Sequence, residues 1–187
     1  MGKKQLLGII GSCRRQGNCE IMVKAAAECM QGWDLSMIRL PLLSIFPCKG
    51  CYACLIPGIR CAIPDDMEWL LEQLTCADAI IIAAPNYVLG PVGIMKMVAD
   101  RALQASPYHH ELGKKRTAVA LTLGREEYRG YADTALVAQV AALGLDIRSI
   151  ELFHGTHPGE VALGEDFSEK IRRIVSSLLD DVIPDHI

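Results

Sequence analysis

Four cysteines lie close together in one short stretch of the sequence, between Pro47 and Met67. They are separated by two, two and six residues: Cys48, Cys51, Cys54 and Cys61. A two-residue gap lets neighbouring thiolates converge on one centre, and Pro57 and Gly58 can bend the chain so that the last cysteine returns to it. Four soft thiolates on one loop are typical of an iron–sulfur cluster. Lys49 and Arg60 would offset part of its negative charge.

Other chemistries compete for these four loop cysteines. Structural zinc usually takes two well-separated Cys-x-x-Cys pairs, which this single run fits poorly. The bacterial ferredoxin run has a shorter last gap and gives its fourth cysteine to a second cluster. One run with a longer last gap therefore predicts a single cubane cluster. A set of reduced thiols, or a disulfide pair, is the alternative without a metal.

A second stretch with binding chemistry follows the apolar residues 5–10. It runs from Gly11 to Cys19, reads Gly-Ser-Cys-Arg-Arg-Gln-Gly-Asn-Cys, and precedes a helical pattern that reaches about Met30. A strand, a polar loop and a helix together bind phosphate, because loop amides and the helix N-terminus point at the anion. The P-loop and dinucleotide glycine patterns are both missing, which favours a mononucleotide such as FMN. The alternative is an ordinary strand–helix turn.

The clearest central strand is predicted over residues 78–84, a continuous apolar run typical of a strand buried on both faces. We expect it to stop at a loop of residues 85–91, before a helix over residues 92–106. Open α/β sheets bind ligands where such strands end, and amides of this loop can reach the polar atoms of a planar ring. Tyr87 can stack on that ring, or it is an aromatic at the edge of the core.

Further strands are predicted over residues 34–40, 117–123 and 146–153, and further helices over residues 65–77, 132–143 and 166–180. Asp65 and Asp66 are expected to cap the helix that they begin. Five strands alternating with five helices predict a doubly wound α/β fold. Its five-stranded parallel sheet is expected to have the flavodoxin-like order 2-1-3-4-5. We expect one domain, residues 1–187, with a cysteine-rich loop at 47–64.

The composition excludes several classes of protein. A chain of 187 residues that is 51 % hydrophobic and 22 % charged is typical of a folded domain and not of a disordered one. A net charge of −3 gives no support for nucleic-acid binding, and no apolar stretch reaches the length of a membrane span. The apolar residues after Lys3 and Lys4 are too few for a signal peptide. We therefore expect a cytoplasmic protein, in which eight cysteines favour metal or redox use.

These features resemble the NADPH-dependent FMN reductase superfamily, and specifically its iron–sulfur flavoprotein branch. The matching segments are residues 11–18, the cysteine run with Asp-Asp-Met at 65–67, residues 84–87, and Lys96 with Asp100 and Arg101. The resemblance implies a flavodoxin-like fold, non-covalent FMN and one [4Fe–4S] cluster on the four loop cysteines. It also implies assembly as a homodimer or homotetramer.

The resemblance further implies roles for single residues. The FMN phosphate would be held by Ser12, Arg14, Gly17 and Asn18. The isoalloxazine ring would be lined by Pro85, Asn86, Tyr87 and Gly90, and closed on its far side by Thr122 and Gly124. Cys19 also belongs to the cofactor site, where the family usually has threonine. A thiol is a weak donor, so we expect a neutral Cys19 and somewhat weaker FMN binding.

The combination predicts an electron-transfer flavoprotein, an oxidoreductase that contains FMN and a [4Fe–4S] cluster. FMN would exchange electrons with the cluster, and the cluster with a redox partner protein or a small oxidant. NAD(P)H is a possible donor, and no side chain is assigned as catalytic. Two alternatives stay open: a cluster-free NAD(P)H-dependent FMN or quinone reductase, and a zinc- or redox-responsive module that is not an enzyme.

Overall fold

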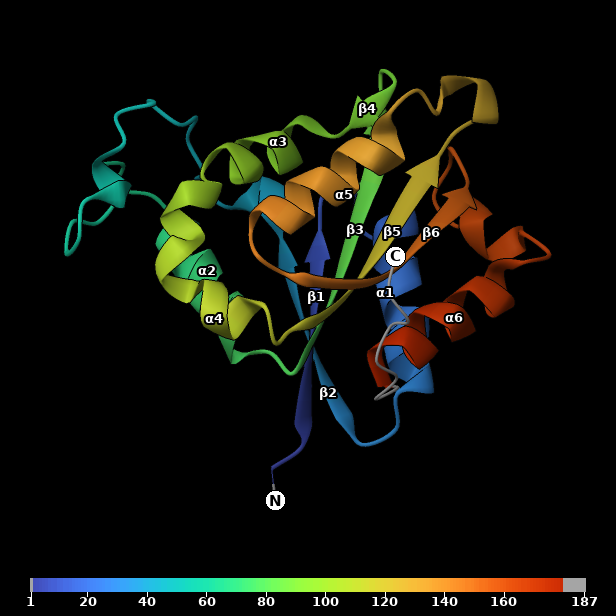
Figure 1. The fold of residues 1–187 in the computed structure, drawn as a ribbon. Helices are drawn as coiled ribbons and strands as arrows, with labels where there is room; N and C mark the ends of the chain where they lie inside the picture. The colour runs from blue at the N-terminus through green and yellow to red at the C-terminus, as the bar shows by residue number, and fades with distance from the viewer. Residues whose placement is uncertain (1, 180–187) are drawn as a thin grey trace, which may run out of the picture.

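The structure, a computed structural model, describes residues 2–179 and is built around one twisted sheet (Figure 1). Its parallel strands are β1 (Lys4–Ile10), β2 (Trp33–Arg39), β3 (Ala79–Tyr87), β5 (Arg116–Leu123) and β6 (Asp146–His154). Their order is β2-β1-β3-β5-β6, and the short strand β4 (Gly90–Pro91) pairs only with β3. The predicted flavodoxin-like order is therefore confirmed, with one small strand added.

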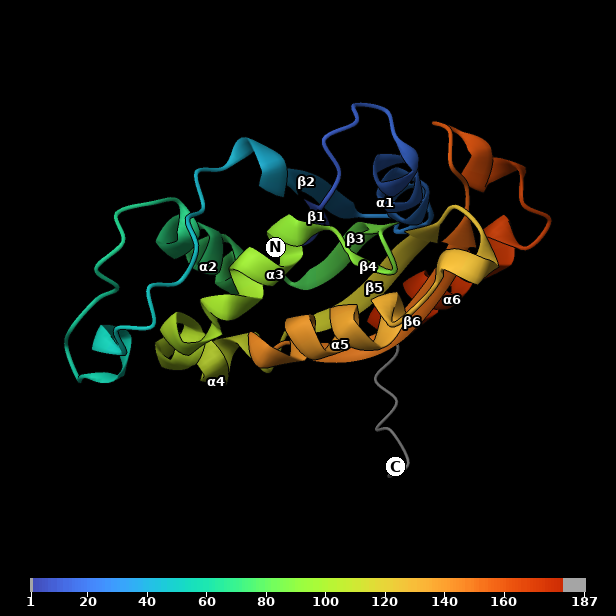
Figure 2. The ribbon, with the colours of Figure 1, turned by 90° about the horizontal axis from the view of Figure 1, so that it is seen from above.

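Helices cover both faces of the sheet (Figure 2). On one face lie α1 (Asn18–Cys29) and α6 (Phe167–Leu179). On the other face lie α2 (Met67–Cys76), α3 (Gly93–Asp100), α4 (His109–Leu112) and α5 (Ala132–Ala142). Within residues 2–179, no helix is both long and apolar enough to cross a lipid bilayer.

Strand β3 shows why its apolar run is continuous. Side chains of a strand alternate between the two faces of the sheet. Ile80 and Ile82 accordingly join the core under α2, α3 and α5, while Ala79 and Ile81 join the core under α1 and α6. Since both faces are covered by helices, neither set of positions tolerates polar side chains. The prediction of a central strand buried on both faces is confirmed.

The end of β3 differs from the prediction. The strand does not stop at residue 84 but continues to Tyr87, and then turns back into β4. Proline usually ends a strand because it cannot donate to a ladder. Here β1 pairs with β3 only as far as Ala83, so the missing N–H of Pro85 breaks no bond to β1, while β5 still pairs beside it.

The helix predicted over residues 92–106 is also divided. Helix α3 ends at Asp100, and a 3-10 segment (Ala102–Tyr108) leads into α4. Arg101 sits at the break with a ψ of 10°, outside the α region. Pro107 further along disfavours an α conformation at the residue before it. The break lets the Arg101 side chain turn into the protein interior.

Gly8 of β1 leaves no room for a side chain, which gives a direct test of the packing against α1. A Cβ atom on Gly8 would lie 2.5 Å from Cγ1 of Val23 and 3.3 Å from Cγ of Met37. We expect Gly8→Ala to lower the free energy of unfolding by about 1–3 kcal/mol, the usual cost of overpacking. Denaturant titration measures this change.

The double variant Gly8→Ala/Val23→Ala should be destabilised by less than the sum of the two single variants, because the second change removes the clashing atom. Gly93→Ala is the control, since a Cβ there meets no atom within 4 Å, and its effect should stay within about 0.5 kcal/mol. A Gly8→Ala protein as stable as the parent would contradict the packing described here.

Candidate functional site

A cavity of about 190 Å³ lies at the carboxyl ends of β1, β3, β5 and β6, and we call it the sheet-edge cavity. It brings together residues from four segments far apart in the sequence. Its lining consists of Ser12, Arg14, Asn18, Cys19, Pro85, Asn86, Tyr87, Thr122, Gly124, Gly155 and Thr156. The residues predicted to hold FMN are therefore all in its wall, except two glycines.

Those two glycines, Gly17 and Gly90, shape the walls without lining the cavity. Gly17 is the N-cap of α1, and a Cβ on it would lie 3.0 Å from Cβ of Arg14. Gly90 lies against the ring of Tyr131, and a Cβ on Gly90 would lie 3.4 Å from Cε2 of that ring. Gly17 is therefore crowded, and a side chain there would press against Arg14, whereas a Cβ on Gly90 would make only ordinary van der Waals contact.

Loop 11–19 is braced from the side by Arg39 of β2. Its Nη1 donates to the carbonyl oxygens of Ser12 and Arg14 at 3.0 and 2.9 Å, and its Nη2 donates to Oε2 of Glu20 at 2.7 Å. The same carboxylate accepts the backbone N–H of Gln16 at 2.8 Å. Neither Arg39 nor Glu20 was predicted from the sequence as a residue of this site. Their only local signal is position: Arg39 is the last residue of β2, and Glu20 lies in the first turn of α1.

Glu20 is held in its charged form. The Lys24 ammonium and the Gln16 amide lower the pKa of Glu20 from its ordinary 4.5 to about 2, and the Arg39 guanidinium adds to the effect. Burial works in the opposite direction but is outweighed. At neutral pH Glu20 is therefore a carboxylate that accepts charge-assisted hydrogen bonds, which are stronger than neutral ones.

Cys19 is buried at the start of α1, with its sulfur 3.9 Å from the Thr122 hydroxyl. Burial raises the pKa of the Cys19 thiol to about 11. The expectation of a neutral thiol at this position is confirmed. A neutral thiol does not repel a phosphate, but it is also a weak donor.

Arg14 and Asn18 make contacts that the sequence did not predict, with the segment that follows β6. Arg14 Nη1 donates to the Thr156 carbonyl at 2.6 Å, and Asn18 Nδ2 donates to the Gly155 carbonyl at 3.1 Å. Asn18 Oδ1 in turn accepts the N–H of Gly159 at 2.9 Å. Gly155 and Thr156 are cavity residues that were missed, although their place after a parallel strand is a usable signal.

Asn86 carries an unused hydrogen-bond acceptor at the cavity. Its Nδ2 donates to the Tyr128 carbonyl at 2.5 Å, whereas its Oδ1 is buried without a partner. A buried acceptor of this kind costs free energy until a donor is supplied. Tyr87 stands half exposed beside it, on the cavity side of the β3–β4 hairpin and not in the core.

That hairpin turns through Val88 and Leu89, which both have positive φ, at 49° and 65°. Such a two-residue turn usually carries asparagine and glycine, and a β-branched residue in this region is strained. The Val88 side chain is 94 % exposed. The strain at Val88 therefore lies beside the cavity, and no packing of the Val88 side chain offsets it.

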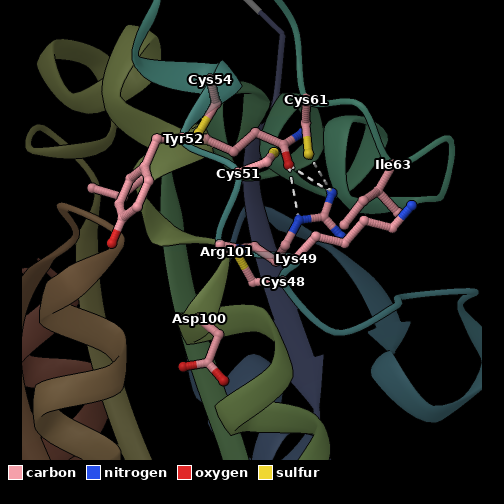
Figure 3. A pocket seen from close by; sticks show the side chains of 12 residues that line it. Cys48, Lys49, Cys51, Tyr52, Cys54, Cys61, Ile63, Asp100 and Arg101 are labelled. Carbon is pink, nitrogen blue, oxygen red and sulfur yellow. Dashed lines mark hydrogen bonds between the residues drawn. The ribbon is translucent and has the colours of Figure 1, made fainter.

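A second cavity, of about 170 Å³, is lined by all four loop cysteines (Figure 3). We call it the cysteine cavity. The loop that forms it projects from the sheet beside α3, and its only regular element is a 3-10 turn, Ala53–Leu55 (Figures 1 and 2). All eight cysteines of the chain are free thiols. Within residues 2–179, no three His, Cys, Asp or Glu side chains are placed close enough together to hold a single metal ion.

The prediction that Asp65 and Asp66 serve mainly as helix caps is corrected by their contacts. Asp66 is the N-cap of α2, but its side chain does not cap the helix and instead accepts the N–H of Ser44 at 2.7 Å. Asp65 does accept the N–H of Met67, at 3.2 Å, and it also accepts the N–H of Phe46 at 2.8 Å. The two carboxylates therefore fasten the start of the cysteine loop to the start of α2.

Arg101 completes this attachment from the end of α3. Its Nη1 donates to Asp65 Oδ2 at 2.7 Å and to the Phe46 carbonyl at 3.1 Å, and its Nη2 donates to Asp65 Oδ1 at 3.1 Å. Both side chains are 1 % exposed. Burial tends to raise the pKa of Asp65, but Arg101 and the two backbone amides outweigh it and lower that pKa below 3.8. Lys96 and Asp100, by contrast, pair with each other on the surface.

The sequence is similar to a known family and to characterised relatives. The family model described as NADPH-dependent FMN reductase matches residues 5–153. An iron–sulfur flavoprotein of Archaeoglobus fulgidus is 31 % identical over 182 residues, which is 93 % of this chain and 78 % of the relative. An iron–sulfur flavoprotein of Methanosarcina thermophila is 32 % identical over 132 residues, which is 70 % of this chain and 68 % of the relative.

Solved structures show the same fold at lower identity. The Trp repressor binding protein from Bacillus subtilis superposes with a TM-score of 0.66 at 18 % identity, covering 95 % of this chain and 99 % of that one. The apo form of an NADH:FMN oxidoreductase superposes with a TM-score of 0.63 at 17 % identity, covering 94 % and 88 %. These likenesses confirm the architecture.

The charged state of Glu20 predicts a pH dependence of stability. A lowered pKa means that Glu20 stabilises the folded state above about pH 4.5 and that this contribution disappears as the pH falls towards 2. We expect Glu20→Gln to cost about 1.5–3 kcal/mol at pH 7, the range for hydrogen bonds to a charged group. The difference from the parent should shrink between about pH 4.5 and pH 2.

Denaturant titrations at a series of pH values measure this difference. Glu28→Gln, which changes an exposed glutamate on the same helix, is the matched control and should be nearly neutral throughout. A gap between Glu20→Gln and the parent that is constant with pH would show that the carboxylate charge does not matter here.

Proposed function

The chain belongs to the NADPH-dependent FMN reductase family, and from this premise we propose that it is an electron-transfer flavoprotein with one FMN and one [4Fe–4S] cluster. The single observation that carries the proposal is the convergence of four unpaired cysteine thiols on one cavity of a flavin-family fold. Electrons would pass between FMN and the cluster, and from the cluster to a redox partner protein or a small oxidant. The proposed assembly is a homodimer or homotetramer.

The sheet-edge cavity fits FMN. Loop 11–19 and the N-terminus of α1 offer backbone N–H groups to the phosphate, with Arg14 adding a positive charge at the cavity wall. The free Oδ1 of Asn86 is an acceptor that a ring N–H of the isoalloxazine would satisfy. Bound FMN supplies the transfer of hydride or of single electrons. The residues of this chain bind it, orient it and set the polarity around it.

The cysteine cavity fits a cluster better than a single ion. A zinc ion draws its thiolates to about 2.3 Å, so its ligands must be packed closely, and no such group exists among residues 2–179. A cubane is larger and takes one thiolate at each of four corners, which suits thiols spread around a cavity. The relatives in Archaeoglobus fulgidus and Methanosarcina thermophila are named iron–sulfur flavoproteins.

A cluster-free NAD(P)H-dependent FMN or quinone reductase is the second candidate. It is favoured by one observation: no residue in the wall of the sheet-edge cavity comes from the cysteine loop. Flavin chemistry could therefore proceed without a cluster. The two candidates differ in iron and sulfide content, so they are separated by composition before any activity is known.

The proposal predicts the composition of protein purified without air. We expect one FMN, about four irons and about four sulfides per chain, a ratio fixed by a single cubane, together with broad visible absorption. Iron and sulfide assays and the flavin spectrum on one sample measure this. Yellow protein without iron or sulfide, even after anaerobic reconstitution, would favour the reductase. About one zinc per chain without flavin would overturn both candidates.

Single substitutions should separate the two cofactors. Cys51→Ser should lose most of the iron and keep FMN, because it removes one of four ligands. Asn86→Ala should keep iron and weaken FMN binding by about tenfold, because a buried hydrogen bond is lost. Cys76→Ser, a change of an exposed cysteine outside the loop, is the control for Cys51→Ser and should keep both.

Iron assays and titration of the flavin-free protein with FMN measure these effects. Equal loss of iron in Cys51→Ser and Cys76→Ser would contradict the assignment of the four loop cysteines. Unchanged FMN affinity in Asn86→Ala would contradict the placement of the ring beside Asn86.

A further inference from the structure

We propose that Arg101 positions Cys61 as a cluster ligand and raises the reduction potential of the cluster through a direct hydrogen bond to the cysteine sulfur. This inference rests on the proposed cluster, and it adds a residue outside the ligand set. The residue does not bind iron. It acts through the ligand that it contacts.

The geometry behind this inference is the direction of one guanidinium N–H. Arg101 Nη2 lies 3.4 Å from the Cys61 sulfur, within hydrogen-bonding distance for a sulfur acceptor. Figure 3 shows the guanidinium pointing towards that sulfur from below the cysteine loop. Among the four loop cysteines, Cys61 is the one separated from the others by the long gap, so it is the ligand most in need of positioning.

The rest of the guanidinium is fixed by other partners. Gln104 Oε1 accepts from Nη2 at 2.7 Å and from Nε at 3.2 Å, and Asp65 accepts two further bonds. Gln104 is itself held by Glu68, which also accepts from the Tyr108 hydroxyl at 2.5 Å. The planar fork of arginine cannot turn away from Cys61 without breaking these bonds.

Burying an arginine costs free energy of desolvation unless its charge is compensated by a partner. Arg101 is fully buried, and a fully buried cation requires a partner such as Asp65. Asp65 neutralises the charge, but the two N–H groups of Nη2 meet three acceptors, Gln104, Asp65 and Cys61, so the bond to sulfur shares a hydrogen with one of the two closer oxygens. A thiol is a poor acceptor, whereas an iron-bound thiolate carries negative charge and accepts well. The arrangement is therefore better suited to a ligated Cys61 than to a free one.

The sign of the effect on the potential follows from charge. Reduction adds one electron, so the reduced cluster is the more negative form. A cation and a hydrogen bond to sulfur stabilise that form and raise the potential. Asp65 opposes part of this effect because its carboxylate lies on the same guanidinium. Both groups are buried, so salt screens their fields only weakly.

A clamp with no electronic role is the competing explanation. Arg101 also ties the Phe46 carbonyl to α3, so its loss could simply loosen the loop. A clamp predicts that Arg101→Gln and Asp65→Asn both lower cluster content and leave the potential of the remaining cluster unchanged. The electronic role predicts shifts of opposite sign in the two variants.

The experiment is an anaerobic redox titration of the full chain, in which electron paramagnetic resonance measures the reduced cluster at each potential. Iron is counted on each sample. Arg101→Gln should lower the equilibrium constant for cluster reduction by about tenfold, which is about 59 mV for a one-electron couple. Asp65→Asn should shift it in the opposite direction. Arg101→Lys keeps the charge but not the fork, and should fall between the parent and Arg101→Gln.

Arg60→Gln is the matched control, because it removes the same charge from an exposed residue directly before Cys61. Its shift should be no more than about a third of that of Arg101→Gln, since solvent screens an exposed charge. An equal shift in the two variants would assign the effect to general charge and overturn the proposal.

The outcomes separate this inference from the proposed function. A parent protein without iron and sulfide overturns the proposed function, and this inference with it. A parent protein with a cluster, but with Arg101→Gln and Asp65→Asn at the parent potential or shifted the same way, overturns this inference alone. If Arg101→Gln retains no cluster, the reduction potentials of Asp65→Asn and Arg101→Lys test the proposal instead. A raised potential in Asp65→Asn supports it.

Discussion

The five long strands of the sheet all run in the same direction, so each one delivers the loop that follows it to the same edge. This constraint makes the sheet-edge cavity. Residues as distant as Ser12 and Thr156 meet there because their strands are parallel, and not because they attract each other. Local bonds then refine the cavity: Arg39 fixes loop 11–19 from β2, and Asn18 links the start of α1 to the segment after β6. Topology supplies the position, and polar contacts supply the precision.

The cysteine loop is positioned by a different kind of force. It lies outside the layers of sheet and helix, and the buried apolar side chains at its two ends are Ile45, just before the loop, and Ile63. Two carboxylates and one guanidinium hold those ends, through Asp66 to Ser44 and through Asp65 to Phe46 and Arg101. A buried ion pair contributes little net stability compared with apolar packing, but it does fix a single geometry when all its bonds are made. The loop is thus placed precisely at its ends.

The sequence was sufficient for features that depend on periodicity or on spacing. The unbroken apolar run before Pro85 predicted a central strand, and the alternation of strands and helices predicted the sheet order. It was insufficient wherever a distant residue outweighed a local rule. Asp65 obeys the local rule for a helix cap, yet Arg101, thirty-six positions later, makes it the centre of a buried network. Arg39 and Glu20 carry no motif, because their meeting depends on β2 lying beside β1. Pro85 appeared to end its strand, and it does not, because its neighbour β1 has already stopped pairing.

Helix α3 joins these two differently built regions. It begins directly after the β3–β4 hairpin, where the Val92 amide bonds to the Pro85 carbonyl, and it ends at the break that sends Arg101 under the cysteine loop. Its eight residues span about 12 Å at the usual helical rise. A helix is stiff over that length, so the spacing between the sheet edge and the cysteine cavity within one chain is set by backbone and not by flexible side chains. For a protein that is proposed to move electrons, this is a physical advantage: the support beneath Cys61 stays at a fixed distance from the sheet-edge cavity, where FMN is proposed to bind.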